Sequence, residues 1–83
     1  MAGVWSYGKD WMPSLKKRSV SLSGHATSLA LEPEFWAVLD AMAAEDGVSA
    51  GKLIARIDRE RGPRPLASAC RVAALQWAER AKG

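Results

Sequence analysis

The sequence contains one cysteine and one histidine among its 83 residues. Cys70 has no second thiol for an internal disulfide and no histidine at metal-ligand spacing, so disulfide and zinc scaffolds are excluded. His25 has no second ligand or base beside it, and a hydrogen bond within a turn is its expected role. This cysteine usage is typical of a reducing compartment.

Long apolar runs and glycine-rich phosphate loops are missing as well. No stretch approaches the roughly 20 apolar residues of a membrane-spanning helix. Ser6, Lys9 and Asp10 interrupt the N-terminal aromatic residues, so we expect no signal peptide, no membrane partner and a cytoplasmic chain. We also expect no enzymatic activity, no cofactor and no metal ion, because the sequence has no metal-ligand cluster and no serine with a matched base.

Charge is distributed unevenly along the chain, whose formal net charge is +3. Residues 1–31 are net basic, residues 32–48 carry five acids and no base, and residues 49–83 carry eight bases against three acids. A protein that binds a polyanion would present the basic flanks and turn the acidic segment away, so the pattern favours nucleic acid. Small soluble domains also reach this net charge without such a partner.

The N-terminal residues 1–16 hold Trp5, Tyr7 and Trp11 among glycines and a proline, without a clean period. This composition predicts a flexible arm that precedes a domain at residues 17–83. The aromatic side chains can cover an apolar patch of that domain, or they can dock on another protein or stack on bases. We favour the first interpretation, because stacking platforms usually sit on a rigid sheet.

Two stretches before the first helix alternate apolar and small side chains, at residues 19–23 and 27–31. In the second stretch Leu29 and Leu31 point inward, as in a strand that is covered on one face. The turn signal at Gly24 is compatible with a hairpin and with one long strand kinked at that glycine.

Three helical patterns follow. The first has Pro33 in its first turn and ends at Gly47 in the left-handed conformation; the second begins at the N-cap Ser49. A break at residues 61–65 precedes a third, alanine-rich helix from Leu66 to about Ala81. On that helix an inward stripe is expected, with two apolar neighbours beside it: Leu66, Cys70, Ala73 and Trp77, with Val72 and Leu75 adjoining. The strand and first two helices are too small to bury their apolar faces alone, so we expect a second copy to complete them.

The stretch from Thr27 to Ile57 resembles the ribbon-helix-helix family of bacterial DNA-binding proteins. Its most specific parts are the junction Leu-Glu-Pro-Glu-Phe-Trp at residues 31–36 and the turn Gly-Val-Ser-Ala-Gly-Lys-Leu-Ile at residues 47–54. Over roughly residues 17–78 the chain is similar to small proteobacterial members with an extra C-terminal helix. The resemblance implies a mainly α fold with a short β element, in which one or two N-terminal strands precede three helices, in an intertwined homodimer. The third helix, which the minimal family unit lacks, can extend the dimer interface or make a tetramer.

In this family one strand from each chain pairs antiparallel, the ribbon enters the major groove, and the second helix clamps a phosphate with its N-terminus. The resemblance implies DNA contacts from outward strand residues and from the end of the second helix: Ala26, Ser28 and Ala30; Ser49, Ala50, Gly51 and Lys52. The basic residues at the start of the domain, Lys16, Lys17 and Arg18, are expected to add affinity for DNA through their charge. It implies a dimer core made of apolar residues: Leu29, Leu31, Phe35, Leu39, Leu53, Ile54 and Ile57.

The outward strand residues suit base readout poorly, because alanine and serine lack the donor and acceptor forks that discriminate guanine or adenine. We therefore predict a dimeric DNA-binding protein, a transcriptional regulator, with weak direct base readout and phosphate clamping at the second helix. The alternative is a protein-interaction module, such as an antitoxin or adaptor, whose N-terminal arm folds on a partner.

Overall fold

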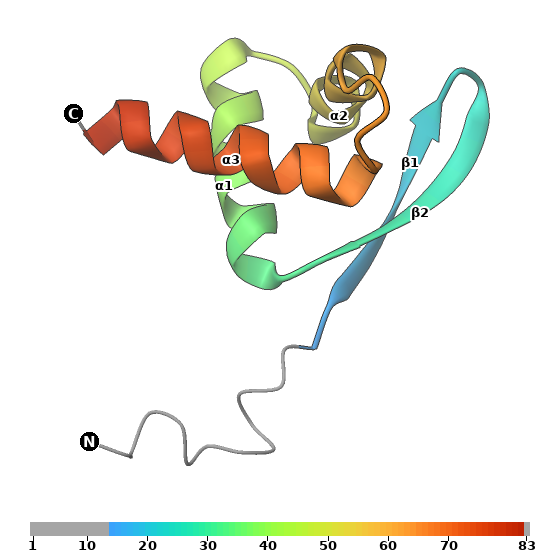
Figure 1. Cartoon of the computed structure of the whole chain (residues 1–83), viewed down its shortest axis with the longest axis horizontal. Helices are drawn as coiled ribbons and strands as arrows, with labels where there is room; N and C mark the ends of the chain where they lie inside the picture. Colours follow the sequence, from blue (N-terminus) through green and yellow to red (C-terminus); the bar gives the residue numbers. More distant parts are fainter. Residues whose placement is uncertain (1–13, 83) are drawn as a thin grey trace.

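The computed structural model describes residues 14–82, so the predicted aromatic arm lies almost entirely outside the described part of the chain. The elements are β1 (Lys16–Leu22), β2 (His25–Leu31), α1 (Pro33–Asp46), α2 (Ala50–Glu60) and α3 (Leu66–Lys82). The three helices lie to one side of the two strands (Figure 1). The predicted fold class, mainly helical with N-terminal strands and three helices, is confirmed.

The two strands form an antiparallel hairpin, with Lys16 opposite Leu31 and Leu22 opposite His25. The two loop residues both have positive φ, 53° at Ser23 and 82° at Gly24. Two-residue hairpin loops adopt this geometry because it matches the twist of the flanking strands. The sequence is compatible with a hairpin and with one long kinked strand, and the structure contains the hairpin. One edge of β2 is therefore occupied by β1 of the same chain, and strand pairing between chains stays a prediction.

The helix boundaries follow the expected local chemistry. Pro33 occupies the first turn of α1, and Gly47 ends that helix in the left-handed conformation with a φ of 71°. The Ser49 hydroxyl accepts a hydrogen bond from the backbone N–H of Lys52 at 3.1 Å, which caps α2. All three predicted signals are confirmed.

One core joins the two strands and the three helices. Its four fully covered side chains come from four different elements: Leu31, Leu39, Ile54 and Cys70, each 0% exposed. Burial raises the pKa of the Cys70 thiol to about 11, and the nearby Asp58 carboxylate adds to the shift. The cysteine is thus a small apolar core residue of low reactivity.

The residues named as a dimer core lie inside the single chain. Five of them are buried and two, Phe35 and Ile57, are partly buried against the same cluster. The third helix supplies the cover that we expected from a second copy, through Cys70 and Ala74. Since residues such as Leu39 are fully covered by their own chain, a partner that leaves this fold intact contacts other residues.

The inward stripe of α3 differs in part from the predicted one. It runs through Ala69, Cys70 and Ala74, whereas Leu75 is 55% exposed. The three buried residues lie within five positions of one another and share one helical face, which turns Leu75 toward solvent. No helix among residues 14–82 is long and apolar enough to cross a membrane.

Candidate nucleic-acid interface

The hairpin has two faces of different character. Val20, Leu29 and Leu31 point toward the helices and are buried. The opposite face, called here the outer ribbon face, consists of three cross-strand pairs: Lys17 with Ala30, Ser19 with Ser28, and Ser21 with Ala26. Five of these six residues are exposed and Ala30 is half-buried, so within residues 14–82 no element covers this face.

The outer ribbon face carries three hydroxyls, two methyls and one ammonium group. It brings together four of the residues predicted to contact DNA: Lys17, Ala26, Ser28 and Ala30. Sequence reasoning missed Ser19 and Ser21, which become part of the face only once β1 pairs with β2. The alternation with the inward-facing Val20 was the signal that could have identified them.

Arg18 lies on the other face of the hairpin, opposite Leu29. Its Nη1 and Nη2 donate to Oδ1 and Oδ2 of Asp40 at 2.9 and 3.0 Å. The guanidinium also lies 4.3 Å from the centroid of the Trp36 ring, a cation–π arrangement. The hydrogen bonds from Arg18 lower the pKa of Asp40. The structure therefore holds Arg18 against α1 and away from Ala26, Ser28 and Ala30.

Trp36 fixes the start of β1. Its indole Nε1 donates to the backbone carbonyl of Lys16 at 2.8 Å, and the side chain is 2% exposed. A buried tryptophan N–H usually finds such a partner. This hydrogen bond attaches Lys16, the first residue of β1, to α1. The Lys16 side chain lies on the same side of the hairpin as Arg18.

The acidic segment lies against the basic flanks of the chain. Three of its five acids pair with arginines of those flanks: Glu32 with Arg71 at 2.9 Å, Asp40 with Arg18 at 2.9 Å, and Asp46 with Arg56 at 2.8 Å. The reason is that α1 packs against α2 and α3, and that Asp40 lies within reach of Arg18 on β1. Arg61 is similarly paired with Asp58 at 2.7 Å.

These ion pairs leave a smaller set of cations for a polyanion. The basic side chains that form no ion pair with another residue of the described part of the chain are Lys16, Lys17, Lys52, Arg59, Arg64, Arg80 and Lys82. Of these, Lys17 lies on the outer ribbon face and Lys52 lies in the first turn of α2.

The N-terminus of α2 brings together the four residues predicted to clamp a phosphate. Ser49 and Lys52 are exposed, and Ala50 and Gly51 are half-buried. The Ser49 side chain and carbonyl engage the N–H groups of Lys52 and Leu53. The amides of Ala50 and Gly51 precede these in the first turn, where helical N–H groups have no partner within the helix. The same helix, α2, also packs against β1 of the hairpin.

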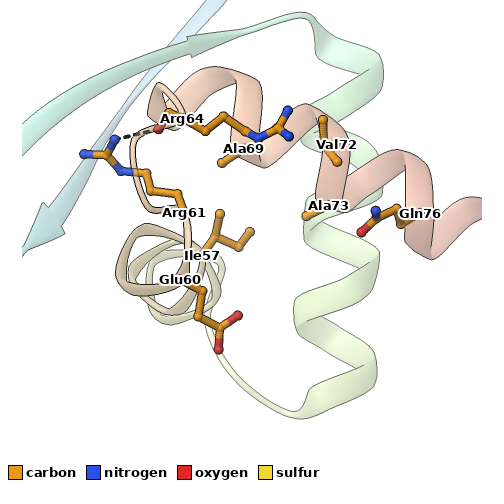
Figure 2. Close-up of a pocket in the computed structure, with 8 residues that line it drawn as sticks. All are labelled: Ile57, Glu60, Arg61, Arg64, Ala69, Val72, Ala73 and Gln76. Carbon is orange, nitrogen blue, oxygen red and sulfur yellow. Dashed lines mark hydrogen bonds between the residues drawn. The ribbon is translucent and has the colours of Figure 1, made fainter.

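A groove of about 340 Å³ separates the end of α2 from α3 (Figure 2). Four apolar residues line it: Ile57, Ala69, Val72 and Ala73. Four polar residues also line it: Glu60, Arg61, Arg64 and Gln76. Figure 2 shows the Arg61 guanidinium turned away from the groove, where its Nη1 donates to the Arg64 carbonyl at 2.7 Å. Sequence reasoning did not anticipate this groove, because it depends on how α3 packs.

Residues 15–78 match the model of the ribbon-helix-helix domain. The chain therefore belongs to the ribbon-helix-helix domain family, whose members are in general dimeric DNA-binding regulators and typically not enzymes. A solved structure similar to this chain is that of an uncharacterised protein from Bordetella pertussis Tohama I. It is 35% identical with a TM-score of 0.77, and the match covers 100% of this chain and 71% of that one. No curated protein matches.

Proposed function

We propose that this protein is a dimeric DNA-binding regulator that places its outer ribbon face in the major groove and binds a phosphate at the N-terminus of α2. The observation that carries the proposal is the uncovered two-stranded ribbon in a chain of this family. The major groove, about 12 Å wide, admits a two-stranded β-ribbon.

The width of the DNA major groove favours the hairpin of one chain as the unit that is inserted. Neighbouring strands lie about 4.8 Å apart, so two strands with their side chains fit the groove. Four strands side by side would span roughly 14 Å between the outer backbones alone, which exceeds it. Each chain of the dimer therefore presents its own hairpin to one half-site, and the dimer reads two half-sites.

The helix end provides the second contact. The free amides of Ala50 and Gly51, the positive end of the helix dipole and the Lys52 ammonium group together suit a phosphate oxygen. A Cβ built on Gly51 would meet only the Ser49 Oγ, at 3.9 Å, so the solvent side of this turn is open to a ligand.

Fluorescence anisotropy against mixed genomic DNA fragments, at low and at physiological salt, tests the proposal on the full chain. We expect binding that weakens steeply with salt, together with a solution mass of two chains. A failure of every fragment to bind at low salt would refute DNA binding, and a monomer mass on DNA would refute the dimer.

Lys52→Ala tests the phosphate contact. We expect weaker binding to all sequences alike and a slope of log K against log salt that is smaller by about one for each bound chain. Lys82→Ala is the matched control, because it removes the same charge from the end of α3 that lies far from the hairpin (Figure 1). Equal losses in the two variants would show that net charge, and not the helix end, determines affinity.

A further inference from the structure

We infer that the outer ribbon face selects DNA through the C5-methyl groups of thymine, so that the target class is A·T-rich duplex DNA. The inference rests on the proposed function, because it assigns the chemistry that the same face reads.

The first step is what the face lacks. Guanine is read by the bidentate contact of arginine or lysine with O6 and N7, and adenine by asparagine or glutamine. The hairpin contains one guanidinium, that of Arg18, and Asp40 and Trp36 hold it on the opposite face. Lys17 is the only long polar side chain of the outer ribbon face, and it lies near the end of the hairpin away from the turn. Guanine readout is therefore confined to one end.

The second step is what the face offers. Ala26 and Ala30 carry methyl groups on β2, four residues apart, which corresponds to roughly 13 Å along a strand. Between them Ser28 faces Ser19, and a serine hydroxyl can either donate a hydrogen bond to an acceptor on a base edge or accept one from a donor. Apolar contact with the thymine methyl is the base-specific interaction that an alanine makes in the major groove.

The third step is access. All six side chains of the face are short except Lys17; five of the six residues are exposed, and Ala30 is half-buried. The ribbon backbone can thus approach the base edges on the floor of the major groove closely. The C5-methyl group of thymine projects from these edges into the groove. Thymine supplies such a group and cytosine does not.

The experiment compares duplexes that differ only in that methyl group. One pair has an A·T-rich sequence with thymine or with uracil throughout, and a second pair has a G·C-rich sequence with cytosine or with 5-methylcytosine. Anisotropy titrations of the full chain at low salt are expected to show tighter binding to the methylated member of each pair, by about fourfold per contacted methyl. The cytosine pair separates methyl contact from any effect of A·T base pairs on DNA shape.

Protein variants assign the effect to the hairpin. The double variant Ala26→Gly with Ala30→Gly is expected to bind thymine and uracil duplexes equally, and Ser21→Gly, a glycine substitution on the same face, is expected to keep the preference. Circular dichroism tests whether each variant is folded. Where a variant unfolds, the comparison of the methylated and unmethylated duplexes with the wild-type protein still decides whether methyl groups are selected.

Each result has a distinct meaning. Salt-dependent binding with equal affinity for both members of each pair overturns the inference and leaves DNA binding in place. A preference that survives when Ala26 and Ala30 are both substituted overturns the assignment to these residues. A complete absence of binding to every duplex at low salt overturns the proposed function and the inference with it.

Discussion

The contact between Trp36 and Lys16 makes a sharp prediction about stability. Trp36→Phe keeps an aromatic ring beneath Arg18 but removes the N–H that donates to the Lys16 carbonyl at 2.8 Å. A hydrogen bond of this kind contributes about 1 kcal/mol net, and leaving its partly buried acceptor without a donor raises the loss to about 1–3 kcal/mol. In a domain of this size each kcal/mol lowers Tm by roughly 4–8 °C.

The same substitution at the second described tryptophan is the control. The Trp77 Nε1 donates to the Glu45 carboxylate at 2.9 Å, but this bond is exposed, so water replaces the lost partner. We expect Trp77→Phe to lower the free energy of unfolding by less than about 0.5 kcal/mol. Urea titrations of the wild type and both variants, followed by circular dichroism, measure the difference. Equal losses of stability in both variants, or an unchanged stability of the Trp36→Phe protein, would refute the claim that the hydrogen bond between Trp36 and Lys16 stabilises the fold.

Two further predictions concern ionisable groups. The pKa of Asp40 is lowered in the folded state, so the stability from its pair with Arg18 is complete above the unfolded pKa near 4 and is lost as the pH falls through the folded pKa. Since the side chains are 43% and 47% exposed, Asp40→Asn should cost about 0.2–1 kcal/mol at pH 7 and nothing at low pH; a pH-independent loss in urea titrations would contradict this. The Cys70 thiol, whose pKa burial raises to about 11, should resist iodoacetamide at pH 8 until urea unfolds the chain, and rapid labelling of the folded protein would show that the core is open.

The fold could be predicted from the sequence where the signals are local. Pro33, Gly47 and Ser49 determine helix ends through their own backbone and side-chain chemistry, and each is found in its predicted role. Local signals do not show which surface packs against the core. Leu39 and Ile54 need an apolar partner surface, and the third helix and a second copy of the chain are equally apolar candidates in the sequence. Only the packing of α3 against them decides for the third helix.

The candidate site shows a similar division. The four residues at the start of α2 are contiguous in sequence, so their grouping at one helix end follows from the N-cap alone. The basic residues before the hairpin are also contiguous, yet the period of two in a strand sends Lys17 to one face and Arg18 to the other. Val20 is two residues from Arg18, so the two side chains share one face of the strand. Because Val20 is apolar and faces the core, the side chain of Arg18 points toward the helices once β1 forms.

The directions in which the basic side chains point also change how the net charge relates to DNA binding. A formal charge of +3 suggests a weak general attraction to nucleic acid. Ion pairs with the acidic segment occupy three arginines of the two basic flanks, whereas Lys17 and Lys52 stay unpaired within residues 14–82. An arginine held in a bidentate pair must give up that pair before it can bind a phosphate, and a solvated lysine gives up only water. The affinity for a polyanion thus depends on where the unpaired cations lie, and both of these lie at the contact sites of the proposed DNA complex.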